Sequence, residues 1–314
     1  MKRIFATVLM LVSFVVSIDK ASAQQDAQYT QYMYNTQSIN PAYAGSRDVL
    51  SVLGLYRSQW IGLEGAPTTG TFSIHSPIGN RVSLGLNIVR DEIFISDETY
   101  VDLDFSYTLK VSEKANLALG LKVGGHLLDV NSNRANTGSF QPNDPNAEIF
   151  IDNKFSPQFG AGAYYYTDTF YFGLSVPNIL ETKHFDESNN SNESSSIAKE
   201  RINSYLITGF VFDLSNDIKF KPSLLTKVVE GAPLQVDLSA NFLFYDKLTI
   251  GAAYRWSAAL SSTVAFQVSD QVLIGFAYDR ETTELQQYND GSYEVFLRFE
   301  LFNNTDRFIS PRFF

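Results

Sequence analysis

Apolar and polar residues alternate along most of this chain, from about residue 49 to residue 302. The alternation is clearest in residues 101–110, which read VDLDFSYTLK, and in residues 234–244, which read LQVDLSANFLF. A period of two over such lengths predicts β-strands that have one apolar face and one polar face. We therefore expect a β-structure over this whole region.

The pattern predicts about fourteen strands, and the connections between them alternate in length. The two longest connections, residues 131–154 and 177–200, follow odd-numbered strands, whereas connections after even-numbered strands have about four residues or fewer. A soluble β-sandwich has no reason to sort its loops in this way. An outer-membrane barrel does, because its periplasmic turns are short and its extracellular loops are long. The predicted strands are residues 49–60, 69–76, 81–93, 97–111, 114–130, 155–167, 169–176, 201–213, 217–228, 234–245, 247–257, 259–268, 271–280 and 291–302.

The expected fold is therefore an all-β transmembrane antiparallel barrel at residues 49–302, with both termini in the periplasm. Residues 1–23 have the organisation of a signal peptide, in which two basic residues precede an apolar stretch and a small-residue cleavage site. The apolar stretch is short for a membrane-spanning helix, which is the alternative. The remaining parts are a periplasmic segment at residues 24–48 and a periplasmic tail at residues 303–314.

The composition narrows the class further. The chain has no cysteine, which excludes disulfides and thiolate metal sites. Its formal net charge is −10, and removal of Lys2, Arg3, Lys20 and Asp19 with the signal peptide makes the mature chain more negative still. So acidic a chain is not expected to bind nucleic acid. The mean hydropathy of −0.10 and the 14% aromatic content suit a barrel with a polar lumen and aromatic girdles.

Charged residues are predicted on the inner face of the wall. A tight turn at residues 245–247 places Asp237 opposite Arg255, and a loop centred on residue 232 places Lys227 beside Asp237. We therefore expect Lys227, Asp237 and Arg255 to form ion pairs inside the lumen. The lumen is then either a wet channel or a plugged one, and neutralisation of the lumen is favoured over substrate conduction as the role of these charges.

Two further positions predict local features of the wall. Pro222 lies inside a predicted strand and lacks a backbone donor, which predicts a bulge or a kink. Leu53 and Leu55 lie on the face opposite to Val52 and Tyr56, so both faces of the first strand are apolar. One of these faces must pack against something inside the barrel, and the N-terminal segment is the candidate.

Residues with catalytic or metal-binding chemistry are sparse. His75 and Ser73 lie two residues apart on one predicted strand, and no nucleotide, hydrolase or metal-ligand motif is present. Asn143 and Asp144 lie in a loop that lacks the dense acidic spacing of a Ca²⁺ site. We therefore expect a protein that is not an enzyme and that has no cofactor and no bound metal.

Several segments go beyond generic features of a barrel. They are QYMYN at residues 31–35, INPAYAGS at 39–46, YRSQWIGLEGAP at 56–67, NFLFYDKL at 241–248, YRW at 254–256 and SPRFF at 310–314. Together these segments resemble the PorP/SprF family of outer-membrane proteins from Bacteroidota. The resemblance extends over essentially the whole mature chain.

The resemblance implies a role in type IX secretion and gliding motility. Family members are either a component of the secretion machinery or paralogues dedicated to one large surface adhesin, which the barrel helps to export or to hold. The expected partners are outer-membrane lipid, type IX secretion components and a large surface adhesin as cargo, with periplasmic secretion or motor lipoproteins as further candidates. Two alternatives stay open: a link from the outer membrane to the periplasmic motor or peptidoglycan, and a porin-like solute channel.

Three sets of residues are candidates for partner binding. The N-terminal segment either plugs the lumen or docks a periplasmic partner, through Tyr29, Tyr32, Tyr34, Asn40, Pro41 and Tyr43. The sequence Glu-Gly-Ala-Pro occurs in two outer loops, where it favours turns and could hold a surface protein, through Glu64, Pro67, Glu230 and Pro233. The C-terminal tail is either an assembly signal or a binding element, through Arg312, Phe313 and Phe314.

Overall fold

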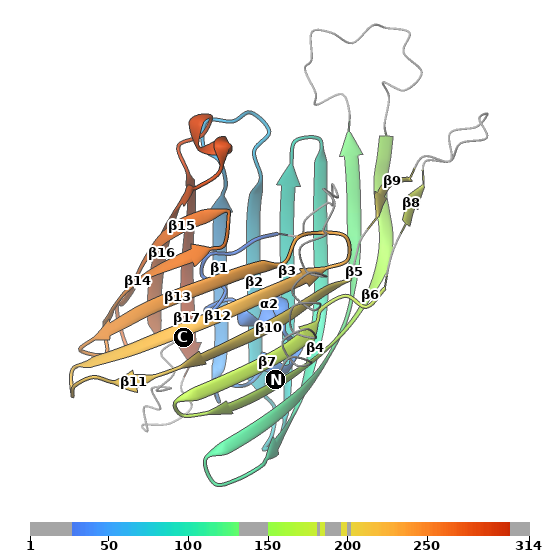
Figure 1. The fold of residues 1–314 in the computed structure, drawn as a ribbon. Coiled ribbons are helices and arrows are strands. Elements are labelled where there is room, and N and C mark those ends of the chain that lie inside the picture. The colour runs from blue at the N-terminus through green and yellow to red at the C-terminus, as the bar shows by residue number, and fades with distance from the viewer. Residues whose placement is uncertain (1–26, 132–149, 181–182, 186–195, 200–201, 302–314) are drawn as a thin grey trace, which may run out of the picture.

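The computed structural model describes residues 27–131, 150–180, 183–185, 196–199 and 202–301. Its main body is an antiparallel sheet of 15 strands, and pairing of β10 with β12 closes this sheet into a barrel (Figure 1). Because β11 continues β10 after one intervening residue, the wall consists of 14 strands, as the alternation predicts. Strands β8 and β9 form a separate small sheet.

The first half of the wall contains β1 (Leu50–Ser58), β2 (Thr68–Pro77), β3 (Val82–Ile93), β4 (Ser96–Lys110), β5 (Ala115–Asn131), β6 (Phe150–Thr167) and β7 (Phe170–Val176). The small sheet contains β8 (Lys183–Phe185) and β9 (Ser196–Lys199). The second half of the wall contains β10 (Asn203–Phe210), β11 (Phe212–Asp213), β12 (Ile218–Val229), β13 (Gln235–Phe244), β14 (Leu248–Arg255), β15 (Ala259–Gln267), β16 (Val272–Glu281) and β17 (Ser292–Leu301).

The two faces of the wall differ in the way that a membrane barrel requires. On β13, Leu238 is 52% exposed, whereas its neighbour Asp237 is 3% exposed. Ile250 on β14 is 48% exposed, and the adjacent Thr249 is buried. Apolar side chains therefore point outward, where lipid surrounds a membrane barrel, and polar side chains point into the lumen.

Every fully described connection of more than four residues lies at one end of the barrel, which we call the loop end, and two of these connections, residues 59–67 and 282–291, lie at the top of Figure 1. The short connections 94–95 and 256–258 lie at the same end. The opposite end, which we call the turn end, has only turns of four residues or fewer in the described part of the chain: residues 78–81, 111–114, 168–169, 214–217, 245–247 and 268–271. By the general rule for outer-membrane barrels, the turn end faces the periplasm and the loop end faces the exterior.

Pro222 affects the wall differently from the predicted bulge or kink. β12 keeps one register with β13 across this residue. On its other side, Ser223 pairs with Gly209 of β10, and pairing resumes where Phe220 meets Phe212 of β11. The missing N–H of proline therefore interrupts one ladder and separates β10 from β11 without shifting the register.

Candidate functional site

An N-terminal segment fills the lumen of the barrel. We call residues 27–48 the plug. Every residue from Tyr29 to Ser46 is buried except Ser38, and the segment contains the short helices α2 (Thr36–Ile39) and η1 (Pro41–Tyr43). The sequence suggests that this segment either plugs the lumen or docks a periplasmic partner. The structure places it inside the lumen, as a plug.

The plug runs from the loop end of the lumen to the turn end. Near its start, the Tyr29 hydroxyl lies 3.0 Å from Oγ1 of Thr71, in the loop-end half of β2. Near its end, the backbone N–H of Gly45 donates to Nδ1 of His75, close to the turn end of the same strand, over 3.1 Å. The start of the plug thus lies toward the exterior, which corrects our placement of the whole segment in the periplasm.

A buried charged cluster holds the start of the plug. Arg57 on β1 forms ion pairs with Asp279 on β16 over 2.7 Å and with Glu294 on β17 over 3.2 Å. The backbone N–H groups of Thr30 and Gln31 donate to the two carboxylate oxygens of Glu294, over 2.9 and 2.8 Å. Arg57 also donates to the Thr30 hydroxyl over 2.7 Å. Wall and plug therefore share ion pairs and hydrogen bonds in a buried site.

The predicted pair of Asp237 and Arg255 is a second anchor. The two residues face each other across β13 and β14, and the Arg255 guanidinium donates to both carboxylate oxygens of Asp237 over 3.0–3.1 Å. Arg255 also donates to the Tyr29 carbonyl and to the Gln28 side chain, each over 3.0 Å. A charge pair predicted only as part of the wall thus also binds the plug.

The predicted position of Lys227 is wrong by one pair of residues. Lys227 faces Gln235, and the residue that faces Asp237 is Leu225. Lys227 is nevertheless buried on the lumen side, where its ammonium group lies 5.6 Å from the centre of the Tyr205 ring. The loop at residues 230–234 is longer than a tight turn, so the sequence did not determine its centre.

Glycines in the wall make room for the middle of the plug. A Cβ atom on Gly120 of β5 would lie 2.1 Å from the backbone nitrogen of Ala42. A Cβ on Gly162, which pairs with Gly120 across β5 and β6, would lie 2.1 Å from the Asn40 side chain. The wall is therefore shaped to fit η1 and the residue before it, because neither position admits a side chain.

The sequence around η1 explains its local structure. The Asn40 side chain accepts a hydrogen bond from the backbone of Ala42 over 3.0 Å, and Pro41 follows at the first helical position. The Asn40 amide nitrogen also donates to the Ala163 carbonyl on β6 over 3.1 Å. Gly45 has φ of +78°, which favours glycine, and turns the chain toward β1. The INPAYAGS segment thus caps η1, bonds to β6 of the wall and turns the chain toward β1.

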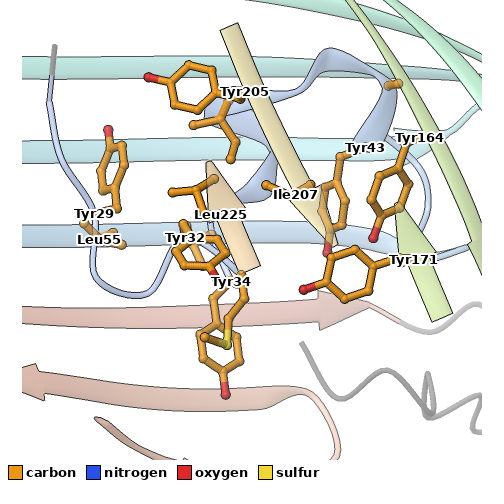
Figure 2. Close-up of a cluster of buried hydrophobic side chains, with 14 of the residues drawn as sticks. Tyr29, Tyr32, Tyr34, Tyr43, Leu55, Tyr164, Tyr171, Tyr205, Ile207 and Leu225 are labelled. Carbon is orange, nitrogen blue, oxygen red and sulfur yellow. The ribbon is translucent and has the colours of Figure 1, made fainter. Parts of the chain in front are cut away.

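Tyrosines of the plug form an aromatic core inside the barrel. Figure 2 shows Tyr32, Tyr34 and Tyr43 among side chains of the wall. Leu53 and Leu55 of β1 belong to this buried cluster, which confirms that the inner face of the first strand packs against the N-terminal segment. Tyr29, Tyr32, Tyr34 and Tyr43 are all at most 7% exposed, so they are not available as a free periplasmic docking surface.

The two Glu-Gly-Ala-Pro copies form similar turns at the loop end. In each copy the backbone N–H of the alanine bonds the carbonyl three residues earlier, from Ala66 to Leu63 and from Ala232 to Val229. The glycines in these turns have φ of +74° and +75°. This geometry accounts for the glycine in both copies by turn chemistry. The tail residues Arg312, Phe313 and Phe314 lie outside the described part of the chain.

The two buried histidines inside the barrel contact neighbouring side chains or the plug. His126 stacks on Tyr100 with ring centres 4.3 Å apart, and its Nε2 lies 3.4 Å from Glu98. His75 accepts a hydrogen bond from the backbone N–H of Gly45 in the plug. Within the described ranges, no three or more His, Cys, Asp or Glu residues gather as a possible metal site. In the same ranges, no helix is long and apolar enough to cross a bilayer.

The sequence indicated some of these anchors and missed others. Arg57, Asp279 and Glu294 were not singled out, although Arg57 lies within a quoted motif. The signal that was available is a charged residue on the inner face of a strand, as for Asp237 and Arg255. The cluster of Arg57, Asp279 and Glu294 was not predictable from local pattern, because β1 meets β16 and β17 only when the wall closes.

The fold and its occupied lumen define the class of protein: an outer-membrane β-barrel plugged by its own N-terminal segment. A family model described as type IX secretion system membrane protein PorP/SprF matches residues 21–299. The chain therefore belongs to the PorP/SprF family of type IX secretion, and its location is the outer membrane. No curated protein matches the sequence.

Solved structures with a similar wall are also outer-membrane proteins. Omp33 of Acinetobacter baumannii has 9% sequence identity and a TM-score of 0.47, with 81% of this chain and 98% of that chain covered. A FadL homologue of Pseudomonas aeruginosa has 13% identity and a TM-score of 0.44, with coverage of 80% and 88%. The NanC porin has 11% identity and a TM-score of 0.41, with coverage of 80% and 100%. We draw no functional conclusion from likeness at this level.

Proposed function

We propose that this barrel helps the type IX secretion system to export or anchor a cell-surface protein such as a gliding adhesin, and that it is not an enzyme. Membership of the PorP/SprF family supports the link to secretion. The role assigned to this chain within that system is a partner-binding one, in which the barrel supplies a fixed support in the outer membrane.

The observation that carries the proposal is the anchored plug. Its start is held by Arg57, Glu294 and Arg255, and its end by an ion pair of 2.7 Å between Arg47 and Glu300. A segment buried along its length and fixed at both ends leaves little room for steady solute flow. This favours partner binding over the porin-like alternative.

Purification of the barrel from its native outer membrane tests the proposal. We expect a cell-surface protein of the type IX system to co-purify in stoichiometric amount. Deletion of the gene should then release that protein into the medium if the barrel anchors it, or retain it in the periplasm if the barrel helps to export it. Co-purification of motor or peptidoglycan-binding proteins alone would contradict the proposal and favour the linking role.

Conductance in planar bilayers separates the proposal from the solute-channel alternative. We expect the purified barrel to remain closed at low voltage. A large and steady conductance in the full-length protein would favour a channel for small solutes.

A further inference from the structure

An apolar groove lies on the outer surface of the wall, across β1, β2, β3, β16 and β17. It has about 650 Å³ of open space, and most of the surface that lines it is apolar. The outer surface of a membrane barrel lies in lipid, so the groove is open to the bilayer and not to the lumen. Its exposed apolar side chains include Tyr56, Phe72, Ile274, Val295 and Leu297.

Two glycines form the floor of this groove. Gly70 on β2 lies between Tyr56 of β1 and Arg90 of β3. Gly54 on β1 pairs with Phe72 of β2. A Cβ atom on either glycine would meet no other atom within 4 Å, so the space above both glycines is open. The larger side chains beside them therefore form the sides of a depression about one side chain deep.

The groove lies in the loop-end half of the wall. Thr68 begins β2 at the loop end, Gly70 lies two residues further along, and Phe72 lies two residues beyond Gly70. On neighbouring strands near the same end, the rings of Tyr278 and Tyr293 lie 5.2 Å apart, as is typical of the aromatic girdle at a membrane interface. The groove therefore leads from the outer interface of the bilayer into its apolar layer.

Charged groups stand at the interfacial end of the groove. The guanidinium of Arg90 donates to Asp97 through Nε and Nη2, over 3.1 and 2.5 Å, and Nη2 also lies 2.7 Å from Glu92. Its Nη1 has no partner within the described part of the chain. The side chains of Arg90 and Glu92 are 58% and 49% exposed. This end therefore offers an accessible pair of donors beside an accessible carboxylate.

We propose that the groove binds one molecule of a phosphatidylethanolamine-type phospholipid. One acyl chain lies over Gly70 and Gly54, in contact with Tyr56 and Phe72. The head-group phosphate accepts hydrogen bonds from Nη1 of Arg90, and the head-group ammonium donates to Glu92. This inference goes beyond the proposed function and does not depend on it.

The charges at the interfacial end select this head group. A phosphate is a strong acceptor for a guanidinium, and an ammonium group is a strong donor to a carboxylate. Phosphatidylglycerol has no ammonium group, so its negative charge would lie beside Glu92 and Asp97 without compensation. The trimethylated nitrogen of phosphatidylcholine has no N–H to donate. A soluble phosphate compound would leave the apolar groove unused.

Native mass spectrometry of the full-length barrel tests the inference. We expect barrel extracted from its native outer membrane in mild detergent to retain one phosphatidylethanolamine molecule. The barrel is then freed of lipid and titrated with the dioleoyl forms of phosphatidylethanolamine, phosphatidylcholine and phosphatidylglycerol. We expect phosphatidylethanolamine to bind about tenfold more tightly than either of the other two, because only it makes both charge-assisted contacts.

A first pair of matched variants tests the groove. Gly70→Leu places a side chain on the floor without a clash in the wall, and the retained lipid should be lost. Gly79→Leu is the control, because a Cβ on Gly79 also meets no atom within 4 Å, but this residue lies in the turn at residues 78–81. It should retain the lipid. Faster migration of unboiled barrel in gels verifies that each variant folds.

A second pair tests the charged end. We expect Arg90→Gln to weaken binding of phosphatidylethanolamine about tenfold, because the phosphate loses a charged donor. Arg81→Gln is the control, because Arg81 is also an exposed arginine but lies at the turn end. Binding to that variant should equal binding to the parent barrel.

The inference fails if the three lipids bind alike, or if Gly70→Leu and Gly79→Leu retain lipid equally, since either result means surrounding bilayer lipid only. It also fails if the native barrel carries a lipid A molecule in place of the phospholipid. Recovery of a dimer that Gly70→Leu dissociates would assign the groove to a second copy of the chain instead.

Discussion

Gly120 on β5 lies against Ala42 in the plug so closely that a Cβ atom at position 120 would stand 2.1 Å from the Ala42 backbone nitrogen. The neighbouring Gly162 has the same relation to Asn40. The wall and the plug are thus complementary in shape as well as in charge. This complementarity means that the plug can be displaced by changes to the wall alone.

We expect Gly120→Val to displace the middle of the plug. Valine suits a β-strand, so the barrel should still form, but the clash with Ala42 should cost about 1–3 kcal/mol of stability. Planar-bilayer recordings should show frequent open events that the parent protein lacks. Gly54→Val is the control, because a Cβ on Gly54 meets no atom within 4 Å. Equal conductance in the two variants would contradict the role assigned to Gly120.

Arg57→Met should destabilise the barrel strongly. Removal of this guanidinium leaves the carboxylates of Asp279 and Glu294 buried without their cation, and loss of one partner from a buried pair costs about 3–5 kcal/mol. Addition of Asp279→Asn and Glu294→Gln to this variant should restore part of the loss. Thermal unfolding followed by gel migration measures the effect.

The matched control for this prediction is Arg90→Met. Arg90 pairs with Asp97 and Glu92, but its side chain is 58% exposed, so its loss should cost less than about 1 kcal/mol. Similar losses for Arg57→Met and Arg90→Met would show that the buried cluster does not hold the structure.

Single cysteines can locate the start of the plug, because the native chain has none. We expect Ala27→Cys, at the partly exposed start of the plug, to react with a membrane-impermeant maleimide on intact cells. Lys247→Cys, in the exposed turn between β13 and β14, should react only after the outer membrane is permeabilised. Protection of Ala27→Cys until permeabilisation would mean that the plug enters from the periplasm.

The two Glu-Gly-Ala-Pro turns can be tested for a role beyond folding. Gly231→Ala, at φ of +75°, should cost about 1–2 kcal/mol from backbone strain. Glu64→Gln and Glu230→Gln should leave stability unchanged, because both side chains are exposed. If these turns serve folding alone, each of the three variants that still folds should co-purify the same amount of the surface protein as the parent barrel. A selective loss with the glutamine variants would assign these loops to partner binding.

The accuracy of the sequence predictions depended on how tightly each loop constrains its strands. The tight turn at residues 245–247 set the register of β13 and β14, so the pairing of Asp237 with Arg255 was predictable. The five-residue loop at 230–234 allowed more than one centre, and the position of Lys227 was wrong. Pro222 was predicted to cause a bulge or a kink, whereas it interrupts the pairing of β12 with β10 and β11 without a register shift, and this outcome depended on the neighbours of β12.

The sequence by itself determined the strands, the sorting of the loops and the outward apolar face, because these follow from local alternation and from the lengths of connections. It also indicated that Leu53 and Leu55 needed an inner partner. Only the tertiary structure decided the direction of the plug, the glycine surface under Ala42 and the cluster around Arg57. These features join residues that are distant in the chain, such as Thr30 and Glu294, and such contacts exist only once the wall has closed around the N-terminal segment.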